Sequence, residues 1–143
     1  MTALEQLRAG HSTASAEETR LLAASLATEL PPDSSIALHG DLGVGKTTFV
    51  QGLARGLGII EPVTSPTFNL LLVHRGPVTL LHLDGYRLET PGQVEDLLLD
   101  DFMISPWYLA VEWPEKVAGW LPDGTLHLEL GISPDQRHTL RLR

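Results

Sequence analysis

The chain has 143 residues, 43% of them hydrophobic, a formal net charge of −8 and no cysteine. This length predicts a single domain over residues 1–143, and the lack of cysteine excludes disulfide scaffolds, thiolate metal sites and cysteine nucleophiles. No apolar run approaches the ~20 residues that span a bilayer, and residues 1–10 lack a signal pattern, so we expect a soluble, cytoplasmic protein that does not contact membranes.

The first predicted element is a helix that begins after Ser15. Ser15 and Glu18 have the spacing of a capping box, in which a hydroxyl and a carboxylate bind free backbone N–H groups. Leucines then recur at helical spacing over residues 22–30, and Pro31 ends the pattern.

A strand, a loop and a second helix follow in direct succession. Residues 35–39 form a short apolar run that predicts a buried strand, and residues 40–45 are rich in glycine. From Lys46 to about Leu57 the pattern predicts a helix, which Gly58 closes.

The middle of the chain predicts three strands and one helix. The apolar segments 70–73 and 79–83 are separated by Arg75-Gly76-Pro77, which indicates two strands joined by a turn. Residues 92–102 predict a helix, and residues 108–111 predict another buried strand.

The chain ends in two alternating segments, 125–130 and 138–142, which predict an antiparallel hairpin. Strands that alternate with helices and then form a hairpin indicate an α/β sandwich with a mixed sheet.

The glycine-rich loop carries the strongest functional signal. Residues 40–47, Gly-Asp-Leu-Gly-Val-Gly-Lys-Thr, fit the phosphate-loop pattern G-x-x-x-x-G-K-[ST] without a gap. The glycines let successive N–H groups point at phosphate oxygens, Lys46 supplies positive charge, and Thr47 offers a hydroxyl to magnesium. The loop also lies between a predicted strand and a predicted helix, whose N-terminus favours anions. The sequence therefore predicts a nucleoside triphosphate site.

Two carboxylates stand at the ends of apolar strands, as a nucleotide hydrolase requires. Asp84 follows the segment 79–83 and Glu112 follows the segment 108–111. Ligands of open α/β sheets bind beyond the carboxyl ends of parallel strands, so both side chains would reach the loop if their strands run parallel to 35–39. The hydroxyls of residues 64–67 form a third candidate, a segment that would order over magnesium, although an ordinary turn explains them as well.

Four motifs together resemble the TsaE (YjeE) family of small bacterial ATPases. They are Gly40-Asp41-Leu42-Gly43-Val44-Gly45-Lys46-Thr47-Thr48-Phe49, Ser65-Pro66-Thr67-Phe68, His82-Leu83-Asp84-Gly85-Tyr86-Arg87-Leu88 and Val111-Glu112-Trp113-Pro114-Glu115. Their order and rough spacing match over about residues 12–122. The first motif is common to a superfamily, whereas the other three in this order are specific.

The resemblance implies a three-layer P-loop NTPase fold with a mixed, mainly parallel central sheet and a C-terminal antiparallel hairpin. It implies catalytic roles for Lys46, Asp84 and Glu112, and magnesium ligands among Thr47, Asp84 and Glu112. We expect Glu112 to orient or deprotonate the attacking water, although the division of roles between Asp84 and Glu112 stays open. The residues expected to contact ATP or ADP are Asp41, Leu42, Gly43, Val44, Gly45, Lys46, Thr47, Thr48, Ser65, Thr67 and Trp113.

Three residues of the matched motifs have more than one interpretation or depart from the pattern. Trp113 would also be explained as a core or surface aromatic at the end of a strand. Arg87 belongs to the pattern, but a salt bridge with nearby acids explains it equally well. Gly85 stands where we expect a larger apolar residue. The six histidines never have metal-ligand spacing, so we interpret them as structural.

The resemblance also implies a role in tRNA modification. Members of the family contribute ATP binding and slow, magnesium-dependent hydrolysis to the complex that makes N6-threonylcarbamoyladenosine at position 37 of tRNA, as accessory subunits beside TsaB- and TsaD-type proteins. The charge distribution agrees, because residues 84–115 contain eight acids and one base, net −7. An acidic chain is a poor independent ligand for nucleic acid.

Three alternative functions use the same kind of loop, and the sequence argues against two of them. A regulatory GTPase normally reads guanine with Asn-Lys-x-Asp, which is absent here. A small-molecule kinase normally has an arginine-bearing lid, and no arginine follows Glu112 until Arg137. A module that binds ATP without turnover is not separable from a slow ATPase by sequence.

Overall fold

A seven-stranded mixed sheet organises the chain, whose computed structural model describes residues 1–63, 70–86, 88, 92 and 99–143. The strand order is β1-β7-β6-β2-β5-β4-β3, in which β6, β2, β5 and β4 run parallel and the other neighbours pair antiparallel. The strands are β1 (His11–Thr13), β2 (Ser34–His39), β3 (Leu71–Arg75), β4 (Thr79–Asp84), β5 (Trp107–Glu112), β6 (Leu126–Ile132) and β7 (His138–Leu142). The mainly parallel sheet and its terminal hairpin are as predicted.

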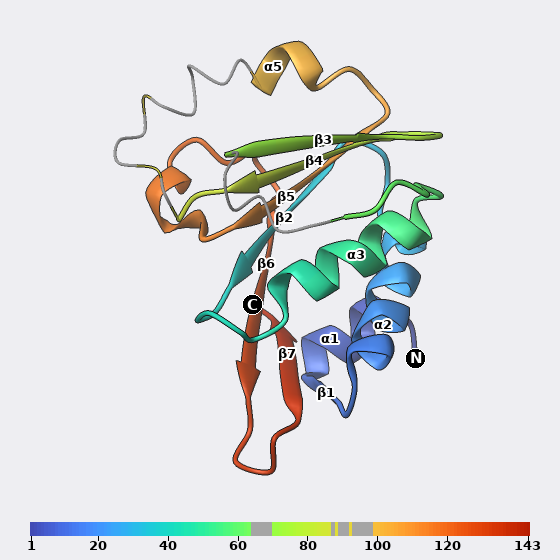
Figure 1. Ribbon diagram of the computed structural model, residues 1–143, viewed down its shortest axis with the longest axis vertical. Coiled ribbons are helices and arrows are strands. Elements are labelled where there is room, and N and C mark those ends of the chain that lie inside the picture. The colour runs from blue at the N-terminus through green and yellow to red at the C-terminus, as the bar shows by residue number, and fades with distance from the viewer. Residues whose placement is uncertain (64–69, 87, 89–91, 93–98) are drawn as a thin grey trace.

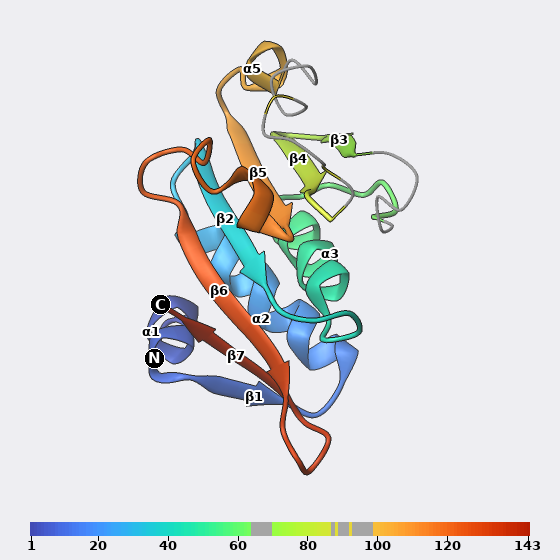
Figure 2. The same cartoon turned by 90° about the vertical axis from the view of Figure 1, so that its left-hand side faces the viewer.

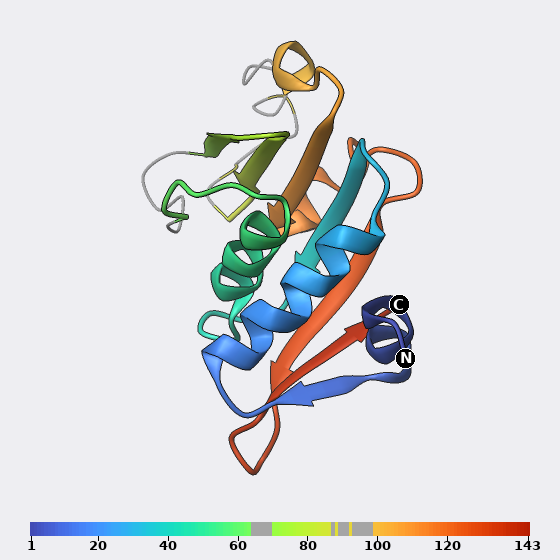
Figure 3. The same cartoon turned by 90° about the vertical axis from the view of Figure 1, so that its right-hand side faces the viewer.

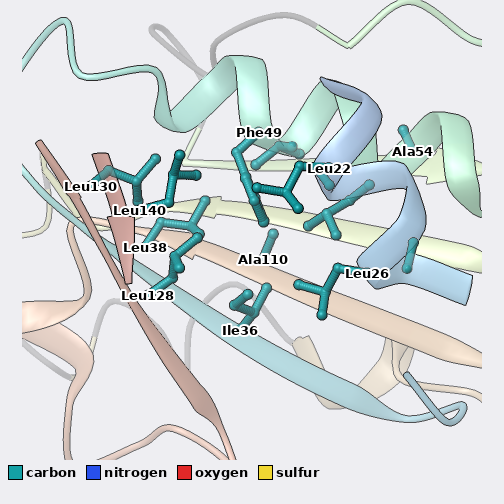
Figure 4. Close-up of a cluster of buried hydrophobic side chains, with 14 of the residues drawn as sticks. Leu22, Leu26, Ile36, Leu38, Phe49, Ala54, Ala110, Leu128, Leu130 and Leu140 are labelled. Carbon is teal, nitrogen blue, oxygen red and sulfur yellow. The ribbon is translucent and has the colours of Figure 1, made fainter. Parts of the chain in front are cut away.

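Three helices cover one face of the sheet (Figures 1 and 3). They are α1 (Ala3–Ala9), α2 (Ala16–Glu29) and α3 (Lys46–Gly56). Leu26 of α2 and Phe49 of α3 are fully buried and meet apolar side chains such as Leu38 of β2 and Leu128 of β6 (Figure 4). This larger core fixes the helix that follows the phosphate loop against the strand that precedes it.

A thinner layer covers the opposite face of β4 and β5. It contains the 3-10 helix η1 (Pro114–Val117) and the short helix α5 (Leu99–Phe102), which contribute Val117 and Leu99 to a second core with Leu83 and Val111. Figure 2 shows η1 in front of the sheet and the long helices behind it. The three-layer α/β sandwich is therefore confirmed, and none of the helices described is long and apolar enough to cross a membrane.

Helices α2 and α3 approach each other closely because two glycines face α2. A Cβ atom at Gly52 would lie 2.4 Å from the carbonyl oxygen of Arg20, and one at Gly56 would lie 2.4 Å from that of Ala24. Such distances exclude any side chain, so both glycines are required by packing rather than by a turn.

The predicted boundaries agree with the structure for most elements. Helix α2 begins after Ser15, whose hydroxyl accepts from the Glu18 N–H, while the Glu18 carboxylate accepts from Ala14 rather than from Ser15. The predicted helix over 92–102 is confirmed only for its end, α5, since residues 93–98 lie outside the described part of the chain.

The first two elements, α1 and β1, were not predicted. An isolated helix of seven residues is unstable in water, and α1 depends on a distant contact: the Glu29 carboxylate accepts from the N–H groups of Ala3 and Leu4, at 2.8 and 3.0 Å. Strand β1 has only three residues and pairs with β7, at the other end of the sequence.

Candidate functional site

The phosphate loop and both predicted carboxylates meet at one edge of the sheet. Because β2, β5 and β4 are parallel neighbours, their carboxyl ends lie together, with Leu38 opposite Glu112 and Glu112 opposite Asp84. They border a cleft of about 450 Å³. Its lining residues are Leu42, Gly43, Gly45, Lys46, Thr47, Thr48, Asp84, Tyr86, Glu112 and Trp113.

The loop over residues 40–45 is shaped by glycine. Gly43 and Gly45 have φ angles of +82° and +98°, a region that other residues seldom adopt. Helices α1 and α2 begin with a side-chain cap from Thr2 and Ser15, whereas Gly45 provides no such cap for α3. The first N–H groups of α3 thus border the cleft without a side-chain acceptor, which suits phosphate oxygens.

Lys46 is 5% exposed and contacts both the loop and an aromatic ring. Its Nζ donates to the Gly40 carbonyl at 2.5 Å and lies 3.4 Å from the centre of the Trp113 ring, a cation–π contact. Burial lowers the pKa of Lys46, and the carboxylates of Glu112, Glu115, Asp84 and Asp41 oppose this shift. The ammonium is therefore close to the phosphate site with little water around it.

Glu112 is 5% exposed and receives two hydrogen bonds on one oxygen. The Thr47 hydroxyl donates to Oε2 at 3.0 Å, and Nε2 of His82 lies 2.5 Å from the same atom. These contacts join the start of α3 to the ends of β5 and β4.

Asp84 is the second carboxylate of the cleft. Burial raises the pKa of Asp84, and the N–H of Tyr86, which donates to Oδ1 at 2.9 Å, acts against that rise. Lys116 of η1 donates to the Tyr86 carbonyl at 3.1 Å, so the segment after β4 is fastened to the segment after β5.

The backbones of Trp113 and Gly85 approach each other closely. Trp113 has φ +54° and ψ +61°, an unusual conformation for a bulky residue, and its ring lies 5.0 Å from that of Tyr86. A Cβ atom at Gly85 would be 2.2 Å from the Trp113 carbonyl oxygen, and the Gly85 N–H donates to the Glu112 carbonyl at 2.8 Å. The larger residue expected at position 85 is therefore excluded by this close approach.

Most of the predicted site residues lie on the cleft, but some do not. Asp41 is exposed outside the lining, and Val44 is 7% exposed with its side chain in the larger core. The Val44 carbonyl accepts from Nδ1 of His138 at 3.0 Å, which ties the loop to β7. Ser65, Thr67 and Arg87 lie outside the described residues.

Comparison with known proteins decides the family. The family model described as "Threonylcarbamoyl adenosine biosynthesis protein TsaE" matches residues 13–140. The chain belongs to the TsaE family. It is 40% identical to the TsaE protein of Treponema pallidum, over 85% of this chain and 90% of that protein, and 36% identical to that of Bacillus subtilis, over 90% and 80%.

A solved structure supports the same fold. The crystal structure of YdiB from Bacillus subtilis superposes with a TM-score of 0.77 at 30% identity and covers 93% of this chain and 82% of that one. The family membership implies a P-loop nucleotide-binding protein, in agreement with the geometry of the loop.

Sequence reasoning missed two residues of this TsaE site. Tyr86 lines the cleft, and His82, interpreted as structural, contacts Glu112. The alternation of a strand contained the signal for His82, because residues two apart share a face of the sheet and His82 precedes Asp84 by two.

Proposed function

We propose that this TsaE-family chain, as one domain over residues 1–143, binds ATP with Mg²⁺ and hydrolyses it slowly. The observation that carries the proposal is the contact between the Thr47 hydroxyl and the Glu112 carboxylate beside an uncapped, glycine-shaped loop. A hydroxyl and a carboxylate at the mouth of such a loop form the donor set that a magnesium–nucleotide complex requires.

The loop and Lys46 bind the phosphates in this proposal. The N–H groups at the start of α3 donate to no side-chain cap and can donate to phosphate oxygens. Lys46 exchanges its bond to the Gly40 carbonyl for a bond to phosphate, and Trp113 keeps the ammonium in place from the other side. Stabilising charge in this way lowers the barrier to phosphoryl transfer.

Thr47 and Glu112 fit a magnesium ion. The described residues contain no group of three or more His, Asp or Glu side chains placed around one metal position. This agrees with Mg²⁺, which proteins usually hold through one or two carboxylates while the substrate phosphates and water complete its shell. When bound, the ion neutralises phosphate charge. We assign Glu112 to it because Thr47 contacts Glu112, and we assign Asp84 to orientation of the attacking water.

The partner assignment follows from the family. The matching relatives are named tRNA threonylcarbamoyladenosine biosynthesis proteins, and we propose that this chain is an accessory subunit, in the cytoplasm, of the complex that modifies adenosine 37 of tRNA. TsaB- and TsaD-type proteins are the proposed partners. With net charge −7 over residues 84–115, the chain leaves direct contact with tRNA to them.

The test combines turnover with assembly. Phosphate release from ATP is measured for the wild type, for Glu112→Gln and for the control Glu115→Gln, whose side chain is 59% exposed and does not line the cleft. We expect Glu112→Gln to lower the rate by roughly 10–100-fold or more and Glu115→Gln to change it by less than about 2-fold. A wild-type rate in Glu112→Gln would refute the catalytic assignment.

Assembly is measured by co-purification with TsaB- and TsaD-type proteins in the presence of ATP, of ADP and of no nucleotide. Association under at least one nucleotide condition is expected. If none yields a complex, the assignment to tRNA modification fails while the ATPase assignment stands.

A further inference from the structure

His82 is a buried imidazole with a single hydrogen bond among the described residues. It lies on β4, is 0% exposed, and places Nε2 at 2.5 Å from Oε2 of Glu112. A carboxylate oxygen accepts hydrogen bonds, so Nε2 carries the proton in this contact. Among the described residues, its other ring nitrogen, Nδ1, has no hydrogen-bond partner. The contact with Glu112 is thus the one polar interaction that the described structure offers to this ring.

The two residues that donate hydrogen bonds to Glu112 come from different parts of the fold. Thr47 comes from the phosphate loop's helix and is assigned above to magnesium, whereas His82 comes from inside the sheet. Both donate to Oε2, and the described residues provide no hydrogen bond to Oε1. Glutamate has three rotatable side-chain bonds, and two donors on one oxygen restrict the orientation of the carboxylate.

An apolar side chain at position 82 could fill the same buried space without placing polar nitrogens in the interior. Leu80, two residues earlier on β4, belongs to the larger core and is 1% exposed. Burying an imidazole nitrogen without a partner is unfavourable, and the bond to Glu112 is the polar interaction that offsets this cost at His82. A metal-binding carboxylate characteristically needs such a second partner to orient it.

We propose that His82 is a positioning residue that orients the Glu112 carboxylate for magnesium. This inference rests on the proposed function, in which Glu112 and Thr47 hold the ion. It predicts that the length and donor capacity of side chain 82 control the use of Mg²⁺ by the site, whereas the binding of ATP alone does not depend on them.

The test compares three substitutions at position 82. In His82→Gln an amide N–H reaches about as far as Nε2, in His82→Asn the same amide is one methylene too short, and in His82→Leu no donor remains. His74→Gln is the control, because His74 is also buried and its ring centre lies 6.5 Å from that of His82, but its ion-pair partner is Glu61. For each protein, kcat and KM for ATP hydrolysis and the Kd for ATP with and without Mg²⁺ are measured.

We expect His82→Asn and His82→Leu to lower kcat by roughly 10–100-fold and to weaken the tightening of ATP binding by Mg²⁺ by a similar factor. The Kd for ATP without Mg²⁺ should change by less than about 3-fold, since the loop and Lys46 are untouched. His82→Gln should restore kcat to within about 5-fold of the wild type, and His74→Gln should remain within about 2-fold.

Three results would overturn the proposal: a wild-type kcat in His82→Leu, equal impairment of His82→Gln and His82→Asn, or loss of magnesium-free ATP binding together with kcat. If His82→Leu does not fold, the comparison between Gln and Asn decides. If the wild type releases no phosphate, the proposed ATPase fails, but the effect of Mg²⁺ on ATP affinity still tests His82. A wild type whose ATP binding ignores Mg²⁺ overturns both.

Discussion

Replacing Gly85 by alanine tests how the two segments at the mouth of the cleft are fitted. The added Cβ would lie 2.2 Å from the Trp113 carbonyl oxygen, 3.2 Å from the Trp113 carbonyl carbon and 3.3 Å from the Glu112 carbonyl oxygen. All three atoms are backbone, so no side-chain rotation relieves the contact. An ordinary separation begins at 3.4 Å, and the backbone after β4 or β5 must therefore move by about 1 Å.

This backbone movement should lower both the stability of the protein and the rate of ATP hydrolysis. Overpacking of this kind typically destabilises by about 1–3 kcal/mol, which corresponds to a fall in melting temperature of roughly 3–10 °C in a chain of this size. Trp113 contacts Lys46 through its ring, and a displacement of about 1 Å near a reacting group lowers rates by up to ~100-fold. We expect Gly85→Ala to reduce both urea stability and phosphate release.

Gly119→Ala is the matched control. A Cβ at Gly119 meets nothing within 4 Å, and the residue is exposed, so this alanine should leave stability unchanged or raise it by up to about 1 kcal/mol through the unfolded state. Urea unfolding and ATP turnover are measured for both variants. A Gly85→Ala protein as stable and as active as Gly119→Ala would refute the close fit between Gly85 and Trp113.

Three further predictions concern stability. Gly52→Ala should destabilise the chain by about 1–3 kcal/mol in urea unfolding despite alanine's better helix propensity, because its Cβ would lie 2.4 Å from the Arg20 carbonyl; a gain in stability would contradict the packing argument. Asp84→Asn should raise the urea midpoint near neutral pH without nucleotide, because burial raises the pKa of Asp84 and the ionised form is the unfavourable one in the fold. The stabilising contribution of the protonated carboxyl is present below the unfolded pKa and lost as pH rises through the folded pKa, so the advantage of Asn should shrink toward acidic pH, and a constant advantage would count against this cause. Burial also lowers the pKa of His39, so its neutral form is favoured in the fold; stability should fall as pH decreases below ~6.5, and His39→Gln should flatten the urea midpoint between about pH 7 and pH 5.

The elements that position the nucleotide site could be predicted because their signals are local. The loop motif fixes where β2 ends and α3 begins, and the apolar runs before Asp84 and Glu112 end where β4 and β5 end. Parallel pairing then follows from strands alternating with helices. Neither the pairing register nor the bond between Thr47 and Glu112 follows from the sequence, because both depend on how the adjacent parallel strands β2, β5 and β4 are assembled.

The features that could not be predicted depend on contacts between distant residues. Helix α1 is held by Glu29, and β1 exists because β7 pairs with it. The role of Gly85 required the left-handed conformation of Trp113, which no propensity indicates for tryptophan. The spacing of the histidines does not reveal the contact of His82, because its partner, Glu112, is 30 residues away in sequence and only the sheet brings them together.

The candidate site contains several groups that are energetically unfavourable when no ligand is bound. Its chemistry is therefore linked to the stability of the free protein. Lys46 is buried and its ammonium donates to a carbonyl, Asp84 is half-buried with a raised pKa, and Trp113 has a backbone conformation that glycine would adopt more easily. Each departs from what packing alone would select, whereas Leu38 of β2 and Val111 of β5 are apolar and fully buried. The proposed ATP and magnesium complex supplies charges opposite to those of Lys46 and Asp84. Substitutions that remove a buried charge here should therefore stabilise the free protein and weaken its use of ATP, a trade-off that the core residues do not show.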